Sequence, residues 1–189
     1  MGWATKIKQF CFVTLRIKKY QWLSDCRNVL GKPNYYHPCL LAGKGRIVFG
    51  DQVQMGVIYS PNYYSHYSFI EAREANSEIK IGNQVAINNN FSAVAFSKIT
   101  ISDFTVIGVN CSIMDSDGHE LSAENRNAEN PKSAEVHIGK HVFLGDNVTI
   151  LKGVTIGDHT VIGNGSIVTK SIPGNVVAAG NPARIIRNL

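Results

Sequence analysis

Aliphatic residues return at every sixth position along the C-terminal half of the chain. The longest unbroken row is Ile138, Leu144, Ile150, Ile156, Ile162 and Val168. The fourth position after each row member is mostly small or β-branched: Val142, Val148, Val154, Thr160 and Ser166, with the bulkier Ile172 as the exception. A helix repeats every 3.6 residues and a strand every two, so neither gives a period of six. A short strand followed by a sharp turn does, and three such units close one triangular coil of about 18 residues.

The six-residue pattern predicts an all-β fold, a parallel β-helix shaped like a triangular prism. The aliphatic row and the small residues point into the prism, and the coils stack about 4.8 Å apart through parallel hydrogen bonds. Each coil buries its apolar row only against its neighbours, so several coils are needed. We expect the Gly or Asn that often follows a row member to adopt the left-handed backbone conformation of a tight turn. The period does not define the hand of the coil, and the usual crossover rule would make it right-handed.

The repeat continues, with interruptions, over most of the chain. Earlier units start at Ile47, Ile79 and Ile99. A slip of the register within 94–100 indicates a small insertion, and the polar segment 118–134, which contains Pro131, is predicted to leave the prism as a protruding loop. Loops on a rigid scaffold often carry function. The predicted divisions are an N-terminal helical or irregular segment, the prism with its loop, and a C-terminal tail, at 1–45, 46–175 and 176–189 respectively.

The first residues of the chain lack the repeat. Apolar side chains recur every three or four positions within residues 3–23, from Trp3 to Trp22, which predicts an amphipathic helix. One interpretation packs this helix against the end of the prism or a neighbouring subunit. The other places it weakly on a membrane surface, because Lys and Arg flank its aromatic residues. The aromatic residues within 57–78 also lie outside the repeat, and they either line a sugar site or cover the prism wall.

The composition narrows the function only a little. A net charge of +5 suits an anionic cofactor, a nucleic acid or a membrane surface and selects none of them. The basic residues are scattered and form no nucleic-acid motif, so we expect no such partner. The four cysteines contain no C-x-x-C pair, which argues against a zinc ribbon and for reduced thiols. Without a signal-peptide cleavage site or the roughly 18 apolar residues of a membrane span, we expect a cytoplasmic protein.

The stretch from Ile156 to Arg187 carries a specific motif, IGDHTVIGNGSIVTKSIPGNVVAAGNPARIIR. It resembles the C-terminal signature of the hexapeptide-repeat acetyltransferases, most closely the maltose, galactoside and polysaccharide O-acetyltransferases. The resemblance covers residues 79–187, with a weaker echo at 45–58. It implies a left-handed prism, acetyl-CoA as co-substrate, and a homotrimer that binds acetyl-CoA along the outside of the prism between two subunits.

The resemblance also implies a catalytic histidine on the loop before the last coils. The segment MDSDGHE at 114–120 matches that loop and makes His119 the general base. The chemistry agrees, because a hydroxyl needs a base as it attacks the thioester and histidine titrates near neutrality. Asp117 and Asp115 are candidates to orient the ring, and a backbone carbonyl would serve equally well.

Other family positions map onto both the acceptor site and the cofactor site. Asn88, with Asn90 as the alternative, matches an asparagine that contacts the substrate and can donate to the developing oxyanion. The positions whose backbone groups bond the pantetheine arm are Gly145, Asp146, Gly163 and Asn164, although Asp146 replaces a commoner small residue. The positions of the tail near the CoA phosphates, where arginine is suited to bidentate contacts, are Thr169, Lys170, Arg184 and Arg187.

These features predict O-acetylation of a sugar hydroxyl in a surface polysaccharide or its precursor, by direct attack with His119 as base. The alternatives are N-acetylation of an amino sugar or a drug, a non-catalytic assembly module, and a metal hydratase. We expect no metal, because His137 and His141 lie on different faces of a corner and His141 and His159 fit an exposed ladder on adjacent coils. Cys111 falls on an inward position and is interpreted as part of the core.

Overall fold

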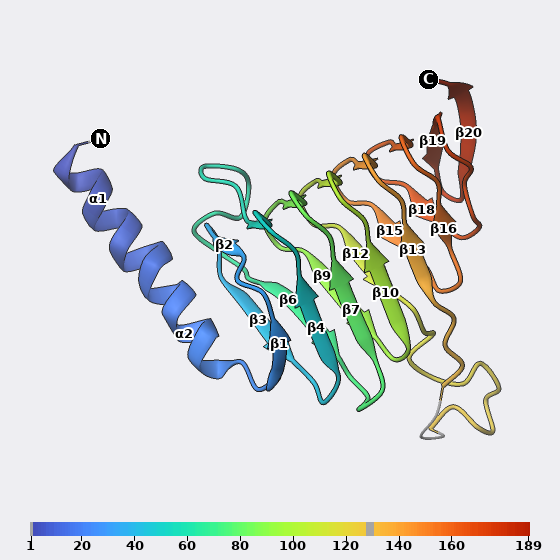
Figure 1. The fold of residues 1–189 in the computed structure, drawn as a ribbon, viewed down its shortest axis with the longest axis horizontal. Helices are drawn as coiled ribbons and strands as arrows, with labels where there is room; N and C mark the ends of the chain where they lie inside the picture. The colour runs from blue at the N-terminus through green and yellow to red at the C-terminus, as the bar shows by residue number, and fades with distance from the viewer. Residues whose placement is uncertain (1, 128–130) are drawn as a thin grey trace.

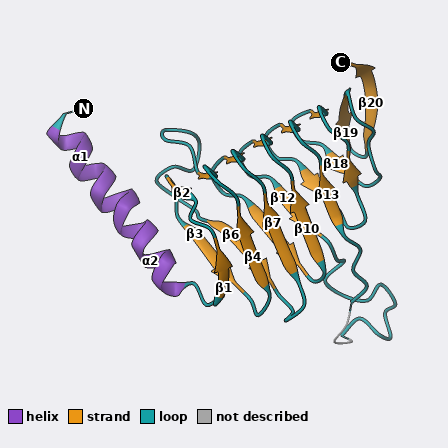
Figure 2. Cartoon of the chain, viewed as in Figure 1, coloured by secondary structure: helices purple, strands orange, loops and turns teal. Residues whose placement is uncertain are grey.

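The computed structural model describes residues 2–127 and 131–189, which form a left-handed parallel β-helix with a helical segment at its N-terminal end (Figure 1). Within the described residues, three sheets make the three faces of a triangular prism, and the chain visits them in a fixed cyclic order (Figure 2). We name these faces sheets A, B and C.

The sheets are built from short strands that pair in parallel from coil to coil. Sheet A contains β1 (Asn28–Leu30), β4 (Arg46–Phe49), β7 (Glu78–Ile81), β10 (Lys98–Ile101), β13 (Val136–Ile138) and β16 (Thr155–Ile156). Sheet B contains β2 (Asn34–Tyr35), β5 (Gln54–Met55), β8 (Ala86–Ile87), β11 (Val106–Ile107), β14 (Phe143–Leu144), β17 (Val161–Ile162), β19 (Val176–Gly180) and β20 (Ala183–Asn188). Sheet C contains β3 (Cys39–Ala42), β6 (Ser68–Ala72), β9 (Ser92–Ala95), β12 (Ser112–Met114), β15 (Thr149–Ile150) and β18 (Ile167–Val168).

The interior of the prism confirms the predicted six-residue row. All six members from Ile138 to Val168 are fully buried, at 0% exposure. The inward polar residues also have partners, since the Thr160 hydroxyl donates to the Pro173 carbonyl at 2.8 Å and the Ser166 hydroxyl to the Gly163 carbonyl at 2.6 Å. Small inward residues therefore fill the corners without leaving an unpaired polar group, which would be costly in the core.

The predicted role of the glycine after a row member is wrong. Gly139 follows Ile138 but does not adopt a left-handed conformation, whereas His141, two residues later, has a φ of 54°. A Cβ atom on Gly139 would lie 2.4 Å from Oδ1 of Asp158 on the next coil. The glycine is needed because a side chain from the neighbouring coil occupies this space. The left-handed residue is the third one after the row member, which is His141 here and a glycine, Gly153 or Gly165, on other coils.

The prism also begins earlier than predicted. Strands β1, β2 and β3 pair in parallel with β4, β5 and β6, so residues 28–45 form the first coil and do not belong to the N-terminal segment. At the other end, β19 continues sheet B, and β20 turns back to pair with it in the antiparallel direction. The predicted tail is therefore part of the folded scaffold. The protruding loop is present between β12 and β13, although 128–130 lie outside the described residues.

The N-terminal segment consists of α1 (Trp3–Gln9), the π-helical turn η1 (Phe10–Thr14) and α2 (Leu15–Leu23). It packs on the prism, as one interpretation predicted: α2 contacts β3, Val13 is buried, and the Tyr20 ring stacks on Tyr67 at 4.4 Å. Tyr67 belongs to a loop at 57–67 that the buried His37 and Asn89 fasten to the prism through hydrogen bonds to its backbone carbonyls. Of the tyrosines in this loop, Tyr63 is buried, whereas Tyr59, Tyr64 and Tyr67 keep exposed faces. None of the helices in the described part of the chain is both long and apolar enough to cross a membrane.

Candidate functional site

Apart from Arg184 and Arg187, which lie on β20, the predicted site residues gather along the two edges of sheet C. We call the corner where its strands begin the leading edge, formed by the turns at 88–91, 108–111, 145–148 and 163–166. We call the corner where its strands end the trailing edge, formed by 96–97, the loop at 115–135, and the turns at 151–154 and 169–171. Within one chain, the width of sheet C separates the two edges.

His119 is exposed on the loop of the trailing edge. Its Nδ1 atom lies 3.1 Å from the carbonyl oxygen of Arg126. Because a carbonyl can only accept a hydrogen bond, Nδ1 carries the proton in this arrangement, and Nε2 of a neutral ring keeps its lone pair. The backbone therefore holds the tautomer that a general base needs. Arg126, which orients the ring through its main chain, carries no signal in the sequence because any residue supplies a carbonyl.

The two acidic residues near His119 have other partners. Asp117 forms an ion pair with Lys152, on the next coil of the trailing edge. Asp115 is buried, and its carboxylate accepts hydrogen bonds from the backbone N–H groups of Phe96 and Ser97 at 2.7 and 2.8 Å. This arrangement differs from the expectation that Asp117 orients the ring. Lys152 was not among the predicted site residues, but its place two residues after a row member matches that of Lys170.

Three consecutive asparagines at the leading edge have separate roles. The buried Asn89 holds the loop at 57–67 through Val57 and Pro61. Asn90 has a φ of 60° and donates to Asn110 at 2.9 Å, and Asn110 donates in turn to Asn147 at 3.1 Å, which forms a ladder along the corner. The side-chain oxygen Oδ1 of Asn88 accepts from the backbone N–H of Asn89, while the side-chain nitrogen Nδ2 of Asn88 has no partner within the described ranges. Asn88 is therefore the asparagine with a free donor.

The residues predicted to contact pantetheine lie on the same leading edge. Gly145 lacks room for a side chain, because a Cβ atom there would lie 2.1 Å from Oδ1 of Asn164. That oxygen accepts a hydrogen bond from the N–H of Asp146, and the Asp146 carboxylate accepts one from the N–H of Val109. Both polar side chains thus cap the turn of the preceding coil. The contacts between stacked coils are enough to explain why Gly145, Asp146 and Asn164 occupy these positions, whether or not a cofactor is bound there.

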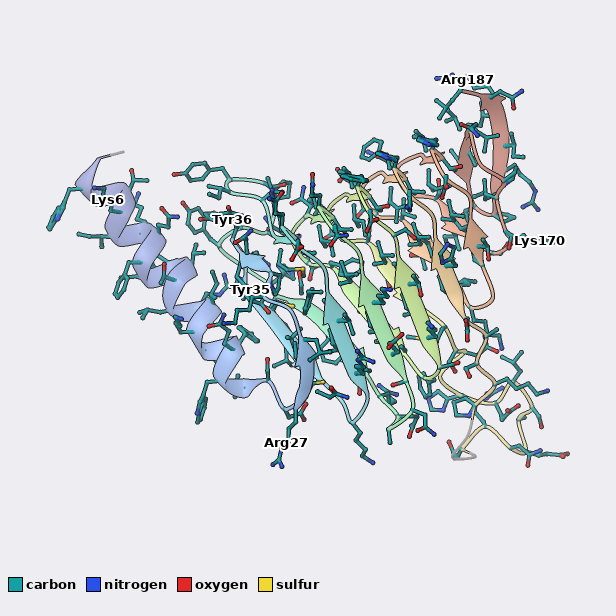
Figure 3. All side chains as sticks on the ribbon, viewed as in Figure 1. Lys6, Arg27, Tyr35, Tyr36, Lys170 and Arg187 are labelled. Carbon is teal, nitrogen blue, oxygen red and sulfur yellow. The ribbon has the colours of Figure 1, made fainter. Side chains whose placement is uncertain are left out.

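The predicted phosphate contacts do not form one cluster in a single chain. Thr169 and Lys170 are exposed at the trailing edge, directly after β18. Arg184 and Arg187 are exposed on β20, where their guanidinium groups donate only to nearby backbone carbonyls. Lys170 and Arg187 project from different parts of the C-terminal end (Figure 3). These cations are free to bind an anion, but one phosphate cannot contact them all in one chain.

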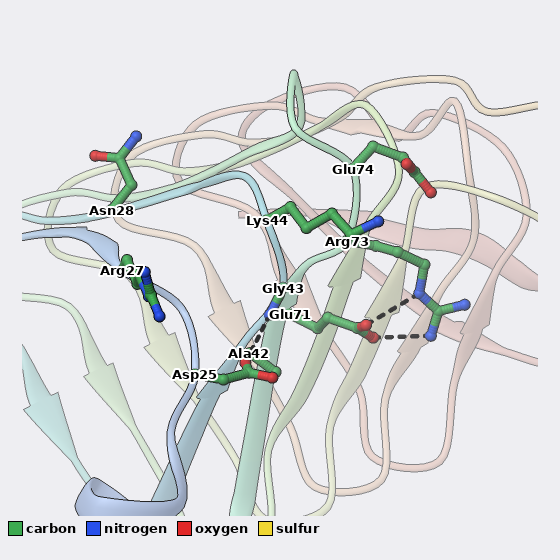
Figure 4. Close-up of a pocket in the computed structure, with 9 residues that line it drawn as sticks. All are labelled: Asp25, Arg27, Asn28, Ala42, Gly43, Lys44, Glu71, Arg73 and Glu74. Carbon is green, nitrogen blue, oxygen red and sulfur yellow. Dashed lines mark hydrogen bonds and ion pairs between the residues drawn. The ribbon is translucent and has the colours of Figure 1, made fainter.

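A charged pocket of about 660 Å³ lies at the trailing edge of the first two coils, between β1, β3 and β6 (Figure 4). Its wall mixes three cationic side chains with three carboxylates: Arg27, Lys44 and Arg73 with Asp25, Glu71 and Glu74. Arg73 makes two hydrogen bonds to Glu71, of 3.1 and 2.8 Å, and lies 4.7 Å from the centre of the Phe96 ring. The backbone of Phe96 is held by Asp115, so this pocket and the His119 loop are structurally connected. No pattern in the sequence marks this pocket, because its charged residues come from three separate segments of the chain.

The remaining candidates have structural roles. His141 and His159 are exposed and stack at 4.9 Å, with Phe104 on the other side of His141, which confirms the ladder. The described residues contain no group of three side chains arranged to hold a metal ion. Cys111 is buried as expected, and burial raises the pKa of its thiol to about 11, so the thiol stays protonated near neutral pH.

The sequence is similar to those of known proteins over most of the prism. The family model described as bacterial transferase hexapeptide (six repeats) matches residues 135–170. Galactoside O-acetyltransferase of Escherichia coli strain K12 is 36% identical over 159 residues, which cover 82% of this chain and 73% of that protein.

Solved structures give the same result. A hexapeptide-repeat acetyltransferase of Vibrio cholerae O1 biovar eltor, crystallised with acetyl coenzyme A, superposes with a TM-score of 0.62 at 28% identity, over 74% of this chain and 69% of that one. The polysialic acid O-acetyltransferase OatWY superposes with a TM-score of 0.66 at 27% identity, over 85% of this chain and 74% of the other.

Proposed function

Because the chain belongs to the hexapeptide-repeat acetyltransferases, enzymes that use acetyl-CoA as co-substrate, we propose that it transfers the acetyl group to a saccharide hydroxyl, with His119 as general base. The observation that carries this proposal is the hydrogen bond between Nδ1 of His119 and the Arg126 carbonyl. Among the described residues, no group occupies Nε2, which lies on an exposed loop where an acceptor can reach it.

The reaction is a direct displacement. Nε2 of His119 removes the proton as the acceptor oxygen bonds to the acetyl carbon. The resulting tetrahedral oxyanion needs a hydrogen-bond donor, and the free amide of Asn88 is suited to this role. The carbon–sulfur bond then breaks, and the imidazolium returns the proton to the CoA thiolate. Neither an acyl-enzyme nor a metal ion takes part in this route.

Asn88 and His119 belong to opposite edges of sheet C within one chain. Val94 pairs with Met114 at the trailing end of sheet C, and Asn88 precedes Val94 by six residues. The strand residues between the two edges, Ser92–Ala95 of β9, span roughly 13 Å. The same width separates Gly163 from Thr169 and Lys170. We therefore propose that the trailing edge of one copy faces the leading edge of the next.

A homotrimer satisfies this arrangement, because a closed ring repeats the same contact three times. Each copy in such a ring would turn sheet C toward the symmetry axis. The outward side chains of sheet C form a continuous uncharged row, which is suited to this position: Leu40, Phe69, Ser92, Ser112, Thr149 and Ile167. Acetyl-CoA would then lie between Gly145 and Gly163 of one copy and Thr169 and Lys170 of its neighbour, with Arg184 and Arg187 near the phosphates.

The saccharide class rests on two relatives whose names state galactoside and polysialic acid as acceptors. The charged pocket gives some support, because it shares the trailing edge with His119 and offers both donors and acceptors to a polar molecule. A panel of neutral, acidic and amino sugars, assayed with acetyl-CoA for free thiol and for the acetylated product, tests the proposal. Turnover of a hydroxyl acceptor supports it. Acetylation confined to amines would replace it with N-acetylation.

A further inference from the structure

The helical segment at residues 3–23 has two different sides. Toward the prism, Val13 is only 2% exposed, and Gln9, Ile17 and Tyr20 are half-buried. The opposite side carries large apolar side chains that nothing in the described structure covers: Trp3, Ile7, Leu15 and Trp22 are 81%, 42%, 48% and 83% exposed. Each lies about one or two helical turns from the next, so they share one side of the helix. Figure 1 shows the prism on one side of α1 and α2 only.

The charge of this segment has a single sign. It contains five basic residues and no Asp or Glu: Lys6, Lys8, Arg16, Lys18 and Lys19. Arg16 donates to the carbonyls of Phe12 and His66 and fastens the helix to the loop at 57–67. The four lysines are exposed and form no ion pair in the described part of the chain. The outer side therefore combines an apolar line with unpaired positive charge.

We propose that the outer side of residues 3–23 binds the surface of a membrane that contains anionic phospholipid. Tryptophan prefers the interface between lipid headgroups and acyl chains, and one lies at each end of the apolar line. Lysines beside such a line can extend their ammonium groups to anionic headgroups while their stems stay apolar. Five basic residues also favour a helix that lies in the plane of the interface.

A membrane surface accounts for these features better than two other occupants. A second copy of the same helix would bring two segments of equal positive charge together, which is unfavourable. A nucleic acid would contact the lysines but leave the line from Trp3 to Trp22 uncovered. This proposal is independent of the acetyl-transfer proposal, because none of these residues belongs to either edge of sheet C.

The chain contains natural fluorescent probes of this segment. Its two tryptophans, Trp3 and Trp22, both lie on the outer side, so intrinsic fluorescence reports on this segment alone. We expect the emission of the full-length protein to shift to shorter wavelength with vesicles of phosphatidylcholine and phosphatidylglycerol, and the protein to sediment with them. Vesicles of phosphatidylcholine alone should bind much more weakly, and added salt should weaken binding to the anionic vesicles.

Charge-reversed variants test where the binding surface lies. The double variant Lys18→Glu and Lys19→Glu should bind anionic vesicles at least roughly tenfold more weakly, because each basic residue near the surface contributes roughly fivefold. The control, Lys32→Glu and Lys80→Glu, changes the net charge equally at exposed positions away from the helix and should bind like the wild type. Both variants should keep wild-type circular dichroism.

Three results would overturn the proposal. The first is no sedimentation with anionic vesicles. The second is equal loss of binding in both double variants, which would indicate attraction by net charge alone. The third is tryptophan emission that is already at short wavelength without lipid and depends on protein concentration, which would show that a second copy covers the outer side.

Discussion

The leading and trailing edges of sheet C are built in different ways, although both border the same strands. At the leading edge, the turns from 88–91 to 163–166 all have the same length, although the loop at 57–67 precedes them on this edge, and Asn90, Asn110 and Asn147 form a ladder along them. At the trailing edge the turns differ in length, and one opens into the loop at 115–135. Ionic contacts such as the Asp117–Lys152 pair replace the ladder there.

This difference indicates that the two edges have different roles. The leading edge is held by the same stacking that holds the prism, so it can present backbone groups and the Asn88 amide in fixed positions. The trailing edge varies without disturbing the core, because its extra residues lie outside the prism. A scaffold of this kind can keep one cofactor site while its acceptor site changes, since loops tolerate insertion.

The largest effect should come from breaking the scaffold that both edges share. Ile150 is fully buried in β15, so Ile150→Asp places an unpaired carboxylate between two coils and should cost several kcal/mol of unfolding free energy, on the order of 2–7 kcal/mol for an uncompensated polar group. Thermal unfolding should show a large drop in Tm. Thr155→Asp, at an exposed position in β16, is the control and should melt close to the wild type. Equal melting of both variants would mean that the assigned inward positions are incorrect.

The next largest effect should come from a substitution at the trailing edge. His119→Ala should lower kcat by roughly 10²–10⁴, the usual scale for the loss of a positioned general base. Its affinity for acetyl-CoA, measured by calorimetry, should stay near that of the wild type. His141→Ala and His159→Ala remove exposed rings from the ladder and should leave kcat almost unchanged. Full activity of His119→Ala on the natural acceptor would end its assignment as the base.

The corresponding change at the leading edge should have a somewhat smaller effect. Asn88→Ala removes the free amide and should lower kcat by roughly 10²–10³, as expected for an oxyanion donor. Asn90→Ala removes a ladder bond and should lower stability slightly with little effect on kcat. If Asn90→Ala had the larger kinetic effect, the donor would be Asn90, and the assignment at this corner would have to be exchanged.

The smallest effect should appear at the C-terminal end. Lys170→Ala and Arg184→Ala should each weaken acetyl-CoA binding, because a hydrogen bond to a charged group contributes roughly 1.5–3 kcal/mol. Neither variant should change Tm much, since both side chains are exposed. Lys80→Ala, on the outer face of sheet A, is the matched control for a lost positive charge. Unchanged affinity in both tail variants would contradict their role near the CoA phosphates.

Much of the fold could be predicted from the sequence because the residues of the six-residue row are those whose side chains point into the prism. The row from Ile138 to Val168 has no slip, and each member is buried. The first coil keeps the six-residue spacing through Val29, Tyr35 and Leu41, but it was missed because an aromatic residue interrupts the aliphatic row and no Gly, Asn or Ser follows any of the three. The role of Gly139 was misassigned because its close neighbour, Asp158, comes from another coil, and such packing between coils is not visible in one repeat.

The site could be predicted only as a set of separate residues. The motif around His119 indicated the base, but not the Arg126 carbonyl that holds its ring, because a main-chain contact leaves no trace in the sequence. Asp117 was expected beside His119, and its pairing with Lys152 depends on how two coils stack. That Asn88 and His119 lie at opposite edges follows from the register of β9 and β12, which only the folded chain shows.

The central claim is that each active site takes His119 from one copy and Asn88 from another. It is tested most directly by coexpressing His119→Ala and Asn88→Ala chains with different affinity tags and purifying the mixed assemblies. In any mixed ring of three copies, one of the three interfaces combines an intact His119 with an intact Asn88. Mixed assemblies should therefore recover roughly a third of the wild-type rate, far above either variant alone. A rate no higher than the sum of the two variants would contradict the shared site and would require both residues to act within one chain.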